Sequence, residues 1–256
     1  MPALKMPSMR IFRNYLTPQV FRTSKFFTTK HKMATAAELI PRVENHVKQY
    51  MSKFDASHDF AHIKRVVHRA HIIHDEIVAD AAKKNQPVPQ YDMTTITLSA
   101  LLHDVGDRKY VDLKRENPKT VINTLLLGFG ADSELAVKIQ AICSAVSYFE
   151  EIKDLQVVRN LIDQYPELAI VQDADRIDSL GAIGVGRVFT YGGAKTRRSM
   201  LESIDIFDWK LLKLRPLMKT EPGRRMAQEA TGRLEQFKKW WVEEVVIEDG
   251  YELRIT

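Results

Sequence analysis

The sequence lacks the features that mark disulfide-stabilised, membrane-spanning or repetitive proteins. Its single cysteine, Cys143, cannot form an internal disulfide, which fits a reducing compartment, and we expect it to be a small buried side chain. No apolar run approaches the roughly 18 residues that a membrane span needs. Repeats and low-complexity segments are also missing. From Met33 onward the chain is long enough for one domain with a sizeable core.

Acidic residues are missing from residues 1–32, which contain seven basic residues. Without this segment the chain has 31 basic and 33 acidic residues, so its net charge falls from +5 to −2. The net charge of residues 33–256 therefore does not indicate a nucleic-acid-binding domain.

The basic segment can form a short amphipathic helix that ends at Pro18, a pattern typical of a mitochondrial transit peptide. The alternatives are a disordered basic extension and a misassigned start, with Met33 as the true first residue. We therefore expect a mitochondrial or a cytoplasmic protein, with residues 1–32 as a leader outside the fold and residues 33–256 as its domain.

The body has few strand signals and many helical ones, with apolar residues at three- to four-residue spacing. Either Ser57 or Asp59 can cap the second helix. Short connections between the helices predict one all-α domain. The expected helical segments are 36–54, 59–84, 94–104, 118–128, 132–147, 154–165, 170–188, 200–217 and 222–246.

The dipeptide His103-Asp104 follows a run of apolar residues that we expect to be a buried helix. Unpaired polar groups are costly in such a place, and a divalent metal would resolve that cost. The structural alternative is that His103 caps the last carbonyl groups of the helix and Asp104 caps the next segment. Two further stretches favour the metal, since read in order the chain offers His, then His-Asp, then Asp.

At this point the sequence resembles the HD superfamily of metal-dependent phosphohydrolases, and most of all its branch linked to nucleoside triphosphate pyrophosphohydrolase activity. The resemblance covers about residues 50–245. The motifs that carry it are Ser-His-Asp-Phe-Ala-His-Ile-Lys-Arg-Val at 57–66, Leu-Leu-His-Asp-Val-Gly-Asp-Arg-Lys-Tyr at 101–110 and Gln-Asp-Ala-Asp-Arg-Ile-Asp-Ser-Leu-Gly-Ala-Ile-Gly at 172–184.

The resemblance implies an HD-domain helical bundle with a buried metal site. Its four implied ligands are His62, His103, Asp104 and Asp175, with Asp173 as the alternate for the fourth. Four ligands leave positions open for water and phosphate oxygens on a metal that prefers six. We favour Mn(II), with Fe, Co, Ni, Mg and Zn as alternatives.

The resemblance also suggests catalytic and substrate-binding residues. Asp107 would orient water or accept its proton, or else cap a helix end. His58 and Asp59 are candidates for a general acid or for support of the ligands, although His58 could equally be a capping residue. The candidates for phosphate binding, any of which could instead be salt-bridged, are Arg65, Lys109, Arg176 and Lys210. We expect Asp178 to hold Arg176 or a neighbouring helix.

The implied reaction is hydrolysis of a nucleoside triphosphate to monophosphate and pyrophosphate. The alternatives are a nucleoside monophosphate phosphatase, a phosphodiesterase and a metal-containing nucleotide-sensing module without turnover. The sequence does not indicate an oligomeric state. It departs from the family at Ile206, where relatives often carry His, and at Phe149, where a lysine is often seen, and both departures bear on the substrate pocket.

Other residues have simpler interpretations. His68, His71 and His74 drift around their helix and do not share one face, so we expect them at the surface. Trp240 and Trp241, in the last expected helix, are expected to be core and packing residues.

Overall fold

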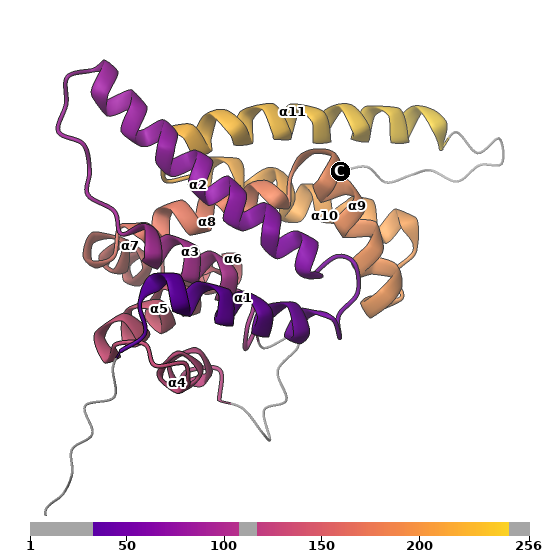
Figure 1. Ribbon diagram of the computed structural model, residues 1–256. Coiled ribbons are helices and arrows are strands. Elements are labelled where there is room, and N and C mark those ends of the chain that lie inside the picture. The colour runs from indigo at the N-terminus through magenta and orange to yellow at the C-terminus, as the bar shows by residue number, and fades with distance from the viewer. Residues whose placement is uncertain (1–32, 108–116, 246–256) are drawn as a thin grey trace, which may run out of the picture. The chain divides into compact units, whose positions relative to one another are not determined.

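The computed structural model describes residues 33–107 and 117–245, and within this part the regular structure is entirely helical (Figure 1). The all-α prediction is confirmed. The α-helices are α1 (Ala36–Met51), α2 (Phe60–Lys83), α3 (Met93–Leu102), α4 (Val121–Gly128), α5 (Ser133–Val146), α6 (Tyr148–Lys153), α7 (Leu155–Gln164), α8 (Glu167–Asp178), α9 (Gly181–Tyr191), α10 (Met200–Trp209) and α11 (Glu221–Glu244). None of them is long and apolar enough to cross a membrane.

Helices α1 and α2 begin at caps that the sequence provides. Thr35 and Glu38 form a reciprocal capping box at the start of α1. Asp59, one of the two predicted caps, accepts a hydrogen bond from the backbone N–H of His62 at 3.0 Å and so starts α2. This cap fixes the first turn of α2, which carries His62.

Helix α3 lies at the centre of the fold, and its residues from Thr95 to Leu102 are all buried. It ends at Leu102, two residues earlier than predicted, so His103 and Asp104 belong to the turn that follows. Gly106 in this turn has a φ of +79°, a left-handed conformation that costs glycine little. The early end of α3 separates the two polar side chains from its apolar surface.

Three segments differ from the sequence-based expectation. Helix α6 was not predicted. The expected helix over residues 170–188 is two helices, because Gly181 adopts a left-handed φ of +63° between α8 and α9. The expected helix over residues 200–217 becomes α10 followed by the 3₁₀ turns η2 (Leu211–Lys213) and η3 (Arg215–Leu217). Pro216 disfavours a continuous helix there because it lacks an N–H donor.

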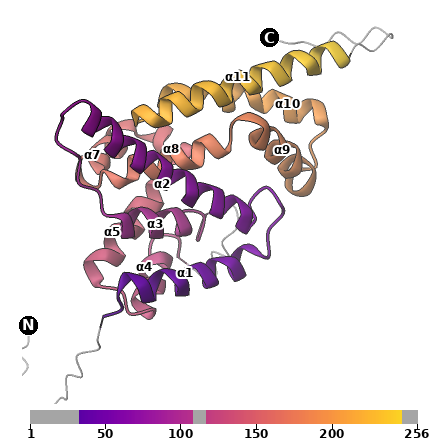
Figure 2. The same ribbon diagram turned by 45° about the horizontal axis from the view of Figure 1, so that its top comes forward.

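Two apolar clusters hold the helices together. One contains residues of α1, α3, α4 and α5, and the other joins α2 and α8 to α10 and α11. Helix α11 packs along α9 and α8, while α1 packs against α3 (Figure 2). Helix α2 contacts both α3 and α8, so one region of the bundle brings together all three sequence motifs.

Side chains outside the motifs follow the predictions in part. Cys143 is buried as expected, and burial raises the pKa of its thiol. Trp241 is half-buried and stacks on Phe189 with ring centroids 5.5 Å apart. The prediction of a core role for Trp240 is wrong, because its side chain is 54% exposed. His68 is exposed, whereas His71 is half-buried and bonds the Thr97 hydroxyl.

Candidate metal centre

Four donor side chains from three segments converge at one point of the bundle. His62 comes from the first turn of α2, His103 and Asp104 from the turn after α3, and Asp175 from α8. The His62 Nε2 atom lies 3.2 Å from His103 Nε2, 3.3 Å from Asp104 Oδ2 and 3.6 Å from Asp175 Oδ1. His103 Nε2 lies 3.5 and 3.7 Å from the same two carboxylate oxygens. His62 Nε2, His103 Nε2 and Asp175 Oδ1 are close enough together for one ion to contact all three, and Asp104 Oδ2 lies within 3.5 Å of both imidazole nitrogens.

Hydrogen bonds fix the orientation of both imidazoles. His62 Nδ1 lies 2.7 Å from Asp178 Oδ2, and His103 Nδ1 lies 2.8 Å from the carbonyl oxygen of Ala100. Because both partners are acceptors, we assign the proton of each neutral ring to Nδ1, which leaves the Nε2 lone pairs facing the centre. Two lone pairs and two carboxylate oxygens that face each other repel unless a cation lies between them.

The carboxyl groups are suited to bind that cation. Burial opposes ionisation of Asp104, but positive charge at the centre, whether on the His103 and His62 rings or on a cation in its place, holds the pKa of Asp104 well below the usual range, so the group is a carboxylate. Its Oδ2 atom is buried and makes no hydrogen bond within the described part of the chain. A buried anionic oxygen without a donor fits a metal ligand, and the set of two imidazoles and two carboxylates suits Mn, Fe or Zn.

Asp178 supports the centre from behind. Besides His62 Nδ1, this fully buried carboxylate accepts hydrogen bonds from Arg65 Nε at 2.8 Å and from an Arg187 guanidinium nitrogen at 3.3 Å. Burial alone would raise the pKa of Asp178, but His62 and Arg65 lower it strongly. A carboxylate that orients a ligating imidazole in this way fixes its tautomer and raises its basicity.

One cavity adjoins three of the four donors, and a larger one shares part of its wall. The smaller, of about 60 Å³, is lined by His103, Asp104 and Asp175 together with His58 and Asp107. The larger, of about 230 Å³, shares with it the residues His58, Phe149, Ser179, Arg187 and Lys210. We call the larger one the side pocket, and its further lining residues are Gly184, Val188, Tyr191, Arg198, Ile206, Trp209 and Leu211.

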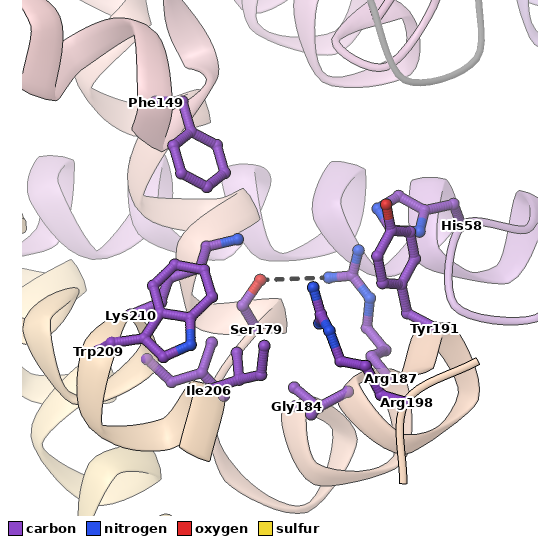
Figure 3. Close-up of a pocket in the computed structure, with 12 residues that line it drawn as sticks. His58, Phe149, Ser179, Gly184, Arg187, Tyr191, Arg198, Ile206, Trp209 and Lys210 are labelled. Carbon is purple, nitrogen blue, oxygen red and sulfur yellow. Dashed lines mark hydrogen bonds between the residues drawn. The ribbon is translucent and has the colours of Figure 1, made fainter. Parts of the chain in front are cut away.

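The side pocket is cationic and aromatic. Arg187, Arg198 and Lys210 line it, and no described carboxylate does. Figure 3 shows Trp209 and Phe149 on one side of the pocket, with Arg187 and Arg198 on the other. The Lys210 ammonium lies 5.2 Å from the centre of the Phe149 ring, close enough for a cation–π contact. Such a pocket is suited to an anionic ligand that also carries a flat apolar part.

Known proteins resemble this chain over most of its length. No protein-family model matches it. The uncharacterized protein YpgQ of Bacillus subtilis is 28% identical over 199 residues, which cover 77% of this chain and 88% of YpgQ. The crystal structure of YpgQ in complex with ADP has a TM-score of 0.60 at 26% identity, covering 83% of this chain and 98% of that one. A crystal structure of an HD-superfamily hydrolase from Bacillus thuringiensis has a TM-score of 0.53 at 29% identity, covering 82% of this chain and 98% of the hydrolase. The fold is that of the HD superfamily.

Asp173 and Asp175, the two candidates for the fourth ligand, have different surroundings. Asp175 lies among the donors, whereas the buried Asp173 faces the start of α11. There Asp173 accepts hydrogen bonds from the backbone N–H groups of Lys219 and Thr220 and from the Thr220 hydroxyl. Burial raises the pKa of Asp173 and these bonds lower it in part. Asp173 therefore anchors the start of α11 to α8.

The predicted phosphate-binding residues have different surroundings. Arg65 is bonded to Asp178 through two guanidinium nitrogens. Arg176 is 2% exposed; it pairs with the buried Glu151 and donates to the carbonyl oxygen of Leu217, although it also reaches the wall of the smaller cavity. Of the two roles expected for Asp178, the structure shows the second, because Asp178 holds the neighbouring helix α2 through Arg65. Of the four candidates Lys210 lines both cavities, and Lys109 lies outside the described residues.

The proposed catalytic residues occupy two places. His58 and Asp107 line the smaller cavity beside the donors. The His58 ring bonds the Ser57 hydroxyl at 2.7 Å, and that hydroxyl in turn bonds Asp55. Asp59 caps α2 and lines neither cavity. Only His58 and Asp107 of these three are therefore placed to face a substrate.

Sequence reasoning missed two basic residues of the pocket. Arg187, which we did not single out, follows the glycines of α9; its Nε donates to the Ser57 carbonyl at 2.7 Å. Arg198 follows Arg197, whose φ of +53° places it in the left-handed region. Such a conformation in a non-glycine residue is uncommon and often occurs at functional sites. Only the charges of these residues could have pointed to them in the sequence, and many surface arginines share that property.

Proposed function

We propose that this HD domain is a divalent-metal-dependent phosphohydrolase that acts on nucleotides. The observation that carries the proposal is the convergence of four donor atoms beside a pocket with three cationic side chains and no described carboxylate. The structural similarity to an HD-superfamily hydrolase supports hydrolysis. The ADP complex of YpgQ supports a nucleotide as the ligand.

Mn(II) is the proposed ion, held by His62, His103, Asp104 and Asp175. When bound, such an ion would polarise a phosphoryl oxygen and lower the pKa of a coordinated water. Asp107 would accept the water proton or orient the water, because it lines the same cavity as the ligands. His58, which lines the same cavity, would protonate the leaving oxygen.

The proposed substrate is a nucleoside triphosphate, cleaved to monophosphate and pyrophosphate. Water would form a bond to the α-phosphorus, the bond from that phosphorus to the bridging oxygen would break, and pyrophosphate would leave. Arg187 and Lys210 line both cavities and Arg198 lines the side pocket, so three cations can bind a polyphosphate. This number of positive charges exceeds what a monophosphate needs and favours a good pyrophosphate leaving group.

The test is hydrolysis of a nucleoside triphosphate with Mn(II) in water enriched in heavy oxygen. We expect monophosphate and pyrophosphate to appear together without a diphosphate intermediate, with the heavy oxygen in the monophosphate. Heavy oxygen in orthophosphate, or turnover of monophosphates alone, would contradict the proposed reaction and favour the phosphatase alternative. The Asp104→Ala variant, purified and assayed in the same way, is the control for any contaminating activity.

A further inference from the structure

Trp209 is a large apolar side chain that the fold leaves exposed at the side pocket. It is the last residue of α10, its side chain is 44% exposed, and it lines the pocket together with Ile206 of the same helix. Exposed indole is costly to leave in water, and a flat ring that covers it regains this free energy. The position of Trp209 therefore suggests that it contacts a ligand.

The order of residues along the two cavities assigns an end of the ligand to Trp209. Phe149, Arg187 and Lys210 line both cavities, whereas Trp209 and Arg198 line the side pocket alone. A nucleotide whose phosphate lies at the metal centre must place its sugar and base farther away. The side pocket, with Trp209, Ile206 and Leu211 in its wall, shares lining residues with the cavity at the donors and is a space into which they can extend.

We infer that the Trp209 indole stacks on the nucleobase of the substrate and so selects nucleotides over base-free polyphosphates. The inference rests on the proposed function and names the residue that recognises the base. The apolar side chains beside Trp209 exclude water from the stacked ring, while Lys210 and Arg187, which line both cavities, are placed to contact the phosphate at the metal centre. Trp209 is a binding residue in this arrangement and takes no part in proton transfer.

The lining of the side pocket has few groups that could distinguish one base from another. No side-chain amide or carboxylate lines the side pocket among the described residues, and the Ser179 hydroxyl bonds Arg187. Stacking tolerates every base because each has a π face. We therefore expect the enzyme to accept all four common nucleoside triphosphates with kcat/KM values within about tenfold of each other. The purine nucleotides should have the higher values, because their larger rings stack over more of the indole.

The chain contains a matched control for this inference. Trp240 is also exposed, at 54%, but it lies on α11 and lines neither cavity. We expect Trp209→Leu to raise KM for ATP by about 5- to 100-fold with little change in kcat. Hydrolysis of inorganic tripolyphosphate, which has no base, should not change. Trp209→Phe should restore most of the affinity for ATP, and Trp240→Leu should behave as the unmodified protein.

Fluorescence separates failure of this inference from failure of the proposed function. ADP should quench tryptophan fluorescence in the unmodified protein and in Trp240→Phe, but not in Trp209→Phe. Equal KM values for ATP in Trp209→Leu and the unmodified protein, or quenching that survives Trp209→Phe, would overturn the inference. If no nucleotide is hydrolysed but Trp209-dependent quenching occurs, the proposed reaction fails and base stacking stands.

Discussion

At the scale of single residues, the tautomer of His62 decides whether its ring can bind a metal. Asp178 accepts the Nδ1 proton at 2.7 Å, and this leaves Nε2 as a ligand. The same carboxylate pairs with Arg65 and Arg187 while it orients the imidazole, so one positive charge of the two remains uncompensated by it. The metal centre thus depends on a residue outside the four donors.

Asp178→Asn should weaken metal binding without unfolding the protein. The amide can still accept from Arg65, but its NH₂ group can donate to His62 Nδ1 and move the ring proton to Nε2. We expect the Kd for Mn(II), measured by calorimetry, to rise by about 10- to 100-fold. Asp75→Asn, an exposed change on the same helix, is the control. Equal Kd values for the two variants would show that Asp178 does not orient the ligand.

Sequence patterns identified the donors far better than their surroundings. The resemblance to the HD superfamily pointed to His62, the His103-Asp104 pair and Asp175, and the structure brings these four side chains together. The guanidinium groups of Arg65 and Arg176 bind Asp178 and Glu151, which are remote along the chain. Such pairing arises only from packing, so the sequence could not show that these arginines already have carboxylate partners.

At the scale of elements, α8 connects the metal centre to three neighbouring segments. Asp173 binds the start of α11, Asp175 faces the donors, and Asp178 reaches α2. Arg176 pairs with Glu151 of α6, which also pairs with Lys219 at 2.7 Å. Burial and the nearby Arg176 lower the pKa of Lys219. These polar contacts fix the rotation of α8 and therefore the direction of Asp175.

The buried ion pair between Glu151 and Arg176 should contribute far more to stability than the exposed ion pair between Glu150 and Lys153. Removal of Glu151 leaves a 2% exposed guanidinium without its carboxylate, so Glu151→Ala should lower the free energy of unfolding by about 3–5 kcal/mol. Glu150→Ala removes an exposed pair with Lys153 and should cost about 0–1 kcal/mol. Urea unfolding measures both. Similar costs for the two variants would contradict the role assigned to the buried pair.

The element boundaries show what a one-dimensional pattern can predict. Helices with an apolar stripe and a cap, such as α1 and α2, were predicted to within a few residues. The break at Gly181 and the short turns around Pro216 were not, because glycine and proline are compatible with several local structures. Helix α6 was missed because six residues are too few to show a helical period.

At the scale of the whole molecule, the basic leader and the helical domain have separate expected roles. Residues 1–32 lie outside the described residues, and targeting remains a prediction from composition. A reporter fused after residue 32 should enter mitochondria, and a fusion that begins at Met33 should remain in the cytosol. Fluorescence microscopy compares the two. Diffuse signal from both fusions would reject the transit peptide and favour Met33 as the working start.

The central claim is that four donors from α2, the turn after α3 and α8 bind one divalent ion. The most direct measurement is the metal content of the protein after loading with Mn(II) and removal of free ion. The account predicts about one ion per chain for the unmodified protein and for His68→Ala, an exposed histidine on α2. Asp104→Ala should hold far less metal and lose hydrolysis while circular dichroism shows unchanged helicity. Full metal content in Asp104→Ala would contradict the account.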